Sequence, residues 1–192
     1  MSYIKIEDVG GQSLDRINKL LAGIPGGAIK AASSALKRAG EAAKTQAGRF
    51  AAAEYTINKG DFMRNTTIKT KSSATTAGVA SMSISYAGNV LPLLTFNTSY
   101  ARDGSVRTQV KRNGSAELLE HVFVAKISGH TGAYERLGLS RFPLEQKYGP
   151  STGHMMRNED VIEQMDETVR ETFERRAEHE IMRVLNGWGG RG

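Results

Sequence analysis

Residues 121–156 read HVFVAKISGHTGAYERLGLSRFPLEQKYGPSTGHMM, and this stretch is the most informative about the fold. It begins with an apolar run at residues 122–125 that indicates a buried strand. Glycine and proline then recur up to Gly149, Pro150 and Ser151, which favours turns and loops over a helix. A charged amphipathic helix follows. The order strand, loops, helix is typical of an α+β domain.

The segment before this stretch has the period of strands. Met82, Ile84 and Tyr86 alternate with serines, which places all three on one buried face. Further strands are predicted at about residues 67–71, 93–98 and 106–111, with turns at 102–104 and 113–114 and a flexible connection at 72–78. The sequence therefore predicts a central antiparallel sheet of about four or five strands with long loops, rather than a βαβ fold.

The first sixty residues have the period of helices. Ser13 is expected to cap a short helix that ends at the glycines and proline of residues 23–27. A longer helix is predicted from Ala28 to about Tyr55, with an alanine-rich stripe along it. Its interior Gly40 and Gly48 mark either a kink or a tight crossing, because glycine disfavours helix.

A long amphipathic helix is predicted at the C-terminal end. Asn158 is a good cap and Gly187 a good terminator. The expected apolar stripe consists of Ile162, Met165, Val169, Phe173, Ala177, Ile181 and Leu185. We therefore expect one domain, residues 1–192, with a helical part at 1–60, a β-rich part at 61–150 and a C-terminal helix at 158–186.

The composition narrows the function classes. The chain of 192 residues contains no cysteine, which excludes disulfides, cysteine zinc sites and thiol catalysis together. The start, MSYIKIEDVGG, is too polar for a signal peptide, and no run approaches the roughly 18 apolar residues of a membrane span. We expect a soluble protein made in a cytosol, with no membrane partner.

Charge is divided unevenly along the chain. Residues 1–112 contain 16 Lys and Arg against 7 Asp and Glu, and residues 113–192 contain 10 against 13. A basic front and an acidic back favour either a polyanionic partner or head-to-tail contact between copies, as in rings. A solvated acidic helix would explain half of this asymmetry without any partner, so these readings stay open.

The sequence shows no set of residues that would carry catalysis. His121, His130, His154 and His179 lack the spacing of metal ligands, and no HExxH motif or glycine-rich phosphate loop is present. We therefore predict a protein that is not an enzyme and that holds neither a metal nor another cofactor.

A family resemblance covers about Val122 to Leu185. The order of features is a strand, Gly-His-x-Gly, aromatic-x-Arg, Arg-x-Pro-Leu-Glu, Gly-Pro-Ser and a charged helix. This order resembles the bacteriophage minor tail protein Z family, whose members complete the head-proximal end of the tail. The resemblance implies a structural virion protein of the tail or neck, assembled in the host cytoplasm.

The same resemblance implies the partners. They are further copies of the chain in a ring of roughly six, a tail terminator or tail tube protein, the head–tail connector, and DNA passing through the pore. The alternative is a basic nucleic-acid-binding protein without catalysis.

Two sets of candidate residues follow. Expected contacts with a partner or a neighbouring subunit are His130, Tyr134, Arg136, Arg141, Pro143, Gly149, Pro150 and Ser151. A competing interpretation is that residues 141–143 and 149–151 only shape the turn into the last helix. Expected residues facing DNA or a pore are Lys69, Lys71, Lys111 and Arg112.

Overall fold

Contacts divide the chain into two compact units, and each is assembled from segments that lie far apart in the sequence. The first unit contains Met1–Ala47, Ile68–Tyr86 and Ile162–Gly192, and the second contains Gly48–Thr67 and Ala87–Val161. The computed structural model describes residues 2–7, 9, 11–74 and 80–187. Helices and small antiparallel sheets make up both units, which confirms the α+β class.

The first unit contains a three-stranded sheet in the order β1-β3-β2. Strand β1 (Ser2–Ile6) pairs antiparallel with β3 (Ala80–Ala87), so that Ile4 lies opposite Ile84. Met82, Ile84 and Tyr86 are buried, as their alternation predicts. The expectation that the first sixty residues contain only helices is wrong, because β1 is a strand. Its five residues alternate only briefly, which is too short a pattern to stand out.

Helix α2 (Gly27–Glu54) packs through its small residues. Ala32, Leu36, Ala39 and Ala43 are buried, in agreement with the predicted stripe. A Cβ at Gly40 would lie 3.1 Å from the Cε atom of Met82 on β3. Gly40 therefore marks a tight crossing of helix and sheet, one of the two meanings that the sequence left open.

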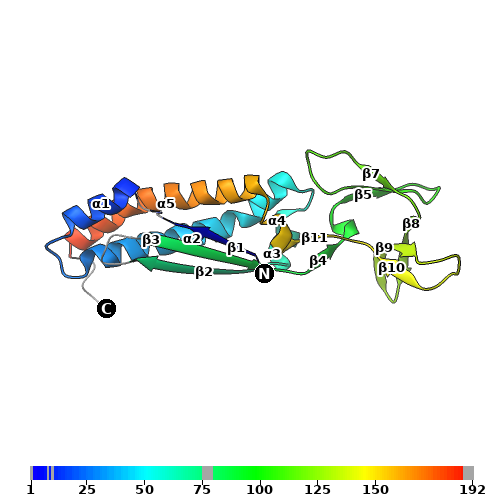
Figure 1. Cartoon of the computed structure of the whole chain (residues 1–192), viewed down its shortest axis with the longest axis horizontal. Helices are drawn as coiled ribbons and strands as arrows, with labels where there is room; N and C mark the ends of the chain where they lie inside the picture. The colour runs from blue at the N-terminus through cyan, green and yellow to red at the C-terminus, as the bar shows by residue number, and fades with distance from the viewer. Residues whose placement is uncertain (1, 8, 10, 75–79, 188–192) are drawn as a thin grey trace. The chain divides into compact units, whose positions relative to one another are not determined.

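Helix α5 (Glu159–Leu185) supplies the longest apolar stripe. The backbone N–H of Asp160 donates to the Asn158 side chain at 2.9 Å, and Gly187 has a φ of 73°, so both predicted ends are confirmed. Figure 1 shows α2, α5 and the sheet of the first unit running lengthwise beside one another. The buried members of the stripe in this unit are Met165, Val169, Phe173, Ala177 and Ile181.

Helix α1 (Gly11–Leu20) lies beside the later turns of α5, where Arg16 forms an ion pair with Glu178 at 2.9 Å. The helix begins at Gly11, so the expected cap at Ser13 is wrong. Leu14 and Ile17 are buried, as the pattern predicts. No helix among the described residues is long and apolar enough to cross a membrane.

The second unit contains short strands in three small sheets, ordered β5-β6-β7, β10-β9-β8 and β11-β4. A small core of Leu93, Val106, Val122 and Ala133 joins several of them. The elements in chain order are α3 (Lys59–Arg64), β4 (Val90–Pro92), η1 (Leu93–Thr95), β5 (Asn97–Tyr100), β6 (Val106–Gln109), β7 (Glu117–Leu119), β8 (Val122–Ile127), β9 (His130–Arg136), β10 (Leu144–Gln146), β11 (Tyr148–Ser151) and α4 (Thr152–Met155).

Two local expectations for the β-rich part are wrong. Residues 93–98 do not form one strand, because η1 turns the chain with the Phe96 N–H bonded to the Leu93 carbonyl at 3.1 Å before β5 begins. Residues 72–74 belong to strand β2 (Thr67–Ala74) rather than to a flexible connection. The rest of that expected connection, residues 75–78, lies outside the described residues. The turns at 102–104 and 113–114 are confirmed.

Candidate interaction site

The hairpin of β9 and β10 presents the most unusual surface of the second unit. Arg136 and Leu144 face each other at its end, and the Leu137 N–H donates to the Pro143 carbonyl at 3.3 Å. We call the enclosed residues 137–143 the β9–β10 loop. Because a backbone hydrogen bond closes it at its base, the loop has a defined shape.

Three large apolar side chains of this loop are in contact with solvent. Leu139 is fully exposed, and Leu137 and Phe142 are 63% and 61% exposed. Apolar groups gathered on one ordered loop gain nothing from the fold of their own unit. Such a group is typical of a surface that a partner covers.

Two arginines frame the loop in different ways. The Arg136 guanidinium lies over the Phe123 ring at 5.0 Å and donates through Nη1 to the Arg141 carbonyl at 2.8 Å. Arg136 therefore holds the loop in place. The Arg141 guanidinium lies over the Phe142 ring at 5.7 Å, beside the exposed apolar group.

A hollow of about 480 Å³ lies at the foot of the loop. Its lining consists of His121, Arg136, Leu137, Gly138 and Leu139. The lining combines apolar side chains with one arginine, so the hollow suits an apolar group that carries or neighbours a negative charge.

Comparisons with known proteins give no relative for this chain. No known family model, curated protein or solved structure matches the chain.

The predicted contact residues separate into two groups. His130, Arg136, Arg141 and Pro143 are exposed. Tyr134 is only 8% exposed and lies opposite Phe123 in the β8–β9 ladder, which is the position of a core residue. Their roles as contacts stay predictions.

Gly149, Pro150 and Ser151 are half-buried and occupy structural positions at β11. A Cβ at Gly149 would overlap the Phe96 ring. The Ser151 hydroxyl accepts from the His154 N–H at 3.1 Å and so caps α4. This geometry favours the interpretation that the three residues shape the turn before the last helix.

Lys147 joins the two strands of the hairpin, although no sequence pattern pointed to it. Glu135 and Glu145 lie directly opposite each other, which would be unfavourable for two carboxylates alone. The Lys147 ammonium lies 2.5 Å from the Glu135 carboxylate and 3.1 Å from the Glu145 carboxylate. Hydrogen bonding to Glu135, and to a smaller extent to Glu145, raises the pKa of Lys147.

The predicted DNA-facing residues lie in two different units. Lys69 and Lys71 are exposed at alternate positions of β2, so they lie on one face of the sheet in the first unit. Lys111 and Arg112 are exposed in the second unit, where the Arg112 Nε donates to the Ala52 carbonyl at 2.6 Å. Arg112 therefore has a structural task as well.

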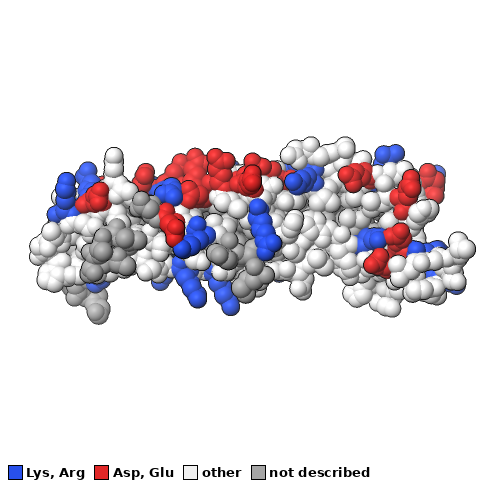
Figure 2. Space-filling model, viewed as in Figure 1, with Lys and Arg blue, Asp and Glu red and all other residues white. Residues whose placement is uncertain are grey.

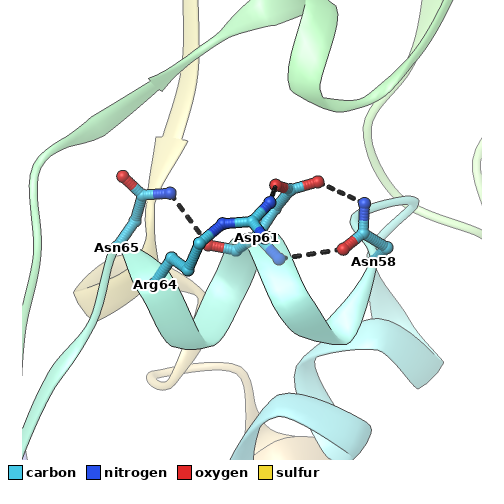
Figure 3. A network of polar contacts seen from close by, with 4 residues as sticks. All are labelled: Asn58, Asp61, Arg64 and Asn65. Atoms are coloured by element: carbon cyan, nitrogen blue, oxygen red, sulfur yellow. Dashed lines mark hydrogen bonds and ion pairs between the residues drawn. The ribbon is translucent and has the colours of Figure 1, made fainter.

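A polar network surrounds the short helix α3 (Figure 3). Asn58 caps the helix by accepting from the Asp61 N–H at 2.8 Å, and the Asp61 carboxylate contacts both Asn58 and Arg64. Asn65 completes the network by donating to the Asp61 carbonyl at 2.8 Å. Arg64 also lines a hollow of about 390 Å³, but its charge is already paired. The network has the features of a local brace, not of a binding site.

No group of three or more His, Asp or Glu side chains that could hold a metal occurs within residues 2–7, 9, 11–74 and 80–187. The described part of the chain therefore offers the β9–β10 loop, rather than a cluster of chemically reactive side chains, as its most distinctive site.

Proposed function

We propose that the protein is a structural component of a bacteriophage tail, located at the head-proximal end, where copies form a ring that joins the tail to the head connector. The order of motifs from Val122 to Leu185 supports this role through its resemblance to the minor tail protein Z family. A protein in that place works by contact with its neighbours.

One observation carries the proposal on the structural side. The motif aromatic-x-Arg ends β9, and the motif Arg-x-Pro-Leu-Glu runs from the β9–β10 loop into β10; both contribute to the resemblance. Between them the chain exposes Leu137, Leu139 and Phe142 on an ordered loop. The motifs of the resemblance thus flank a surface suited to protein contact.

The test is assembly on tail tubes. Light scattering gives the mass of the protein alone and with isolated phage tail tubes, and electron microscopy images the product. We expect a ring, or density that caps one tube end. Replacing Leu137, Leu139 and Phe142 together by serine should abolish capping. The matched control Tyr100→Ser removes a side chain of the same unit that is 65% exposed and should leave capping intact. Bare tubes with the wild-type protein contradict the proposal.

A second candidate, nucleic-acid binding without catalysis, is favoured by the pair Lys69 and Lys71. Both ammonium groups project from one face of β2, and a row of cations on an extended strand suits a phosphate backbone. In this case the protein should bind duplex DNA, measured by fluorescence anisotropy, with an affinity that falls steeply with salt. Lys69→Gln combined with Lys71→Gln should reduce the salt slope by roughly two, whereas Lys126→Gln on β8 should not. Unchanged binding by the double variant removes this candidate.

A further inference from the structure

We propose that the β9–β10 loop docks on helix α5 of a second copy of this chain. The inference rests on the proposed function, which requires contacts between copies, and it adds the two surfaces that meet.

Hydrogen bonds hold the loop in a defined conformation. Its base is closed by the Leu137–Pro143 backbone hydrogen bond, and the Arg136 side chain donates to the Arg141 carbonyl. An ordered loop loses little conformational entropy on docking, which favours affinity. Its exposed apolar side chains include Leu137, Leu139 and Phe142. Arg141 lies in the loop and Arg136 borders it, with no acidic residue from Arg136 to Pro143. The partner surface should therefore be apolar in part and acidic in part.

Helix α5 offers such a surface. An exposed stripe follows the helix at steps of four and three residues, which places its members on one face. The acidic members are Glu163, Glu167, Glu171, Glu174 and Glu178, and the stripe continues with the exposed Met182 and Leu185. Figure 2 shows acidic side chains gathered along α5. One helix face thus begins acidic and ends apolar.

Most of these carboxylates have no ion-pair partner among the residues that the structure describes. Glu178 pairs with Arg16, but among the described residues Glu163, Glu167, Glu171 and Glu174 form no ion pair. Arg175 lies beside the stripe and is a positive charge next to these carboxylates. An array of unpaired carboxylates is complementary to a loop that carries only arginines.

The end of the stripe also offers a place for the apolar side chains. Met182 and Leu185 are 56% and 49% exposed, and Leu20 of α1 is exposed as well. Residues of α1 line a hollow of about 440 Å³ that includes Arg16, the partner of Glu178. In the proposed contact, Leu139 and Phe142 cover Met182 and Leu185, and Arg141 faces Glu174 and its neighbours.

The two surfaces differ, so the contact is heterologous. Each copy would use its loop on one neighbour and its α5 stripe on the other, and such contacts generate closed rings or open chains. This geometry joins the basic loop and the acidic helix without requiring any other molecule.

Cross-linking from the loop tests the pairing directly. The chain contains no cysteine, so Leu139→Cys introduces a unique attachment point for a maleimide benzophenone. Equal amounts of ¹⁴N-labelled and ¹⁵N-labelled protein are mixed and irradiated, and cross-linked peptides are identified by mass spectrometry. We expect the loop of one isotope to be joined to α5 or α1 peptides of the other. Tyr100→Cys, on β5, serves as the control and should not give this product.

The same experiment distinguishes a second copy of the chain from other partners of the loop. Links only within one isotope, links to a different region, or no links overturn the proposal. Samples with anionic lipid vesicles or with duplex DNA are irradiated in parallel, and cross-links that form only with lipid or DNA overturn it too. Capped tail tubes without loop-to-α5 links would refute this contact while sustaining the proposed function. Loop-to-α5 links together with uncapped tail tubes would support this contact and contradict the proposed function.

Charge reversal provides an independent readout that tolerates small losses of stability. Arg141→Glu and Glu174→Arg each place like charges across the contact and should weaken self-association, measured by sedimentation, by about tenfold. Mixing the two variants pairs opposite charges again at every contact and should restore the assembly. Wild-type association of either variant alone, or a mixture that stays dissociated, overturns the pairing.

Discussion

At the scale of single residues, close approach explains why glycine stands at position 88. A Cβ there would overlap the hydroxyl oxygen of Thr152 and the backbone carbonyl of Asn65. Thr152 donates to that carbonyl at 3.3 Å, so neither group can move without loss of a bond. The sequence alone did not predict this requirement, because the three positions are distant along the chain.

Gly88→Ala should therefore destabilise the protein by about 1–3 kcal/mol, as overpacking of a crowded site does. The free energy of unfolding from urea titration provides the measurement. Gly138→Ala is the matched control, because no described atom lies within 4 Å of a Cβ at that position. Equal stabilities of the two variants would contradict the close packing around Gly88.

Tyr86 gives a prediction for alkaline pH. Burial raises the pKa of its phenol above the ordinary value of 10.0, so the folded protein retains this proton more tightly than the unfolded chain does. Its stabilising contribution is complete below pH 10 and is lost as the pH rises above that value. Tyr86→Phe keeps the buried ring, so it should lose less stability than the wild type between pH 8 and about pH 11. Urea midpoints at both pH values measure this. Tyr100→Phe, at an exposed position, should follow the wild type.

At the scale of elements, the long helices were predictable and the small sheets were not. Helices α2 and α5 repeat their apolar pattern over several turns, so chance interruptions matter little. Strand β1 has five residues, and the strands of the second unit have three to seven. Their pairing depends on register between distant segments, which no local pattern contains. One central sheet was expected for this reason, whereas several small sheets form.

The alanine stripe of α2 leads to a prediction about this element. Ala39 is fully buried, so a larger side chain there would have to displace the residues packed around it. Ala39→Leu should destabilise the protein by about 1–3 kcal/mol in urea unfolding. Ala53→Leu, at an exposed position of the same helix, should change the stability by less than about 0.5 kcal/mol. A stable Ala39→Leu variant would contradict close packing of the alanine stripe.

The candidate site was also predicted only in part: the sequence pattern indicated the region, and the structure was needed to show which side chains are exposed. The turn-rich order of residues 121–156 indicated a contact region, and it selected Arg136 and Arg141 as contacts. Both side chains are exposed, and their role as contacts stays a prediction. Leu137, Leu139 and Phe142 were overlooked, because apolar residues in a sequence are first assigned to a core. Their spacing between Gly138, Ser140 and Arg141 was the available signal, since it matches neither a strand nor a helix.

At the scale of the whole molecule, charge and apolar surface act together. The net charge is +6, yet the exposed stripe of α5 is acidic and the β9–β10 loop is basic. A chain that carries both members of a complementary pair can associate with itself. Salt would act on such association in two opposite ways. It screens the repulsion between net charges of the same sign, which favours association, and it also weakens the attraction across a complementary contact.

These opposing effects predict a particular response to salt. In the proposed contact the loop and the stripe would bring arginine and glutamate close together, so the local attraction should outweigh the repulsion between whole molecules. Self-association measured by sedimentation equilibrium should therefore weaken about tenfold between roughly 0.05 and 0.5 M NaCl. Leu139→Ser should weaken it at both salt concentrations, because the apolar part of the contact is not screened. Association that strengthens with salt would mean that the copies meet through apolar surface alone. The acidic stripe of α5 would then not be the surface on which the loop docks.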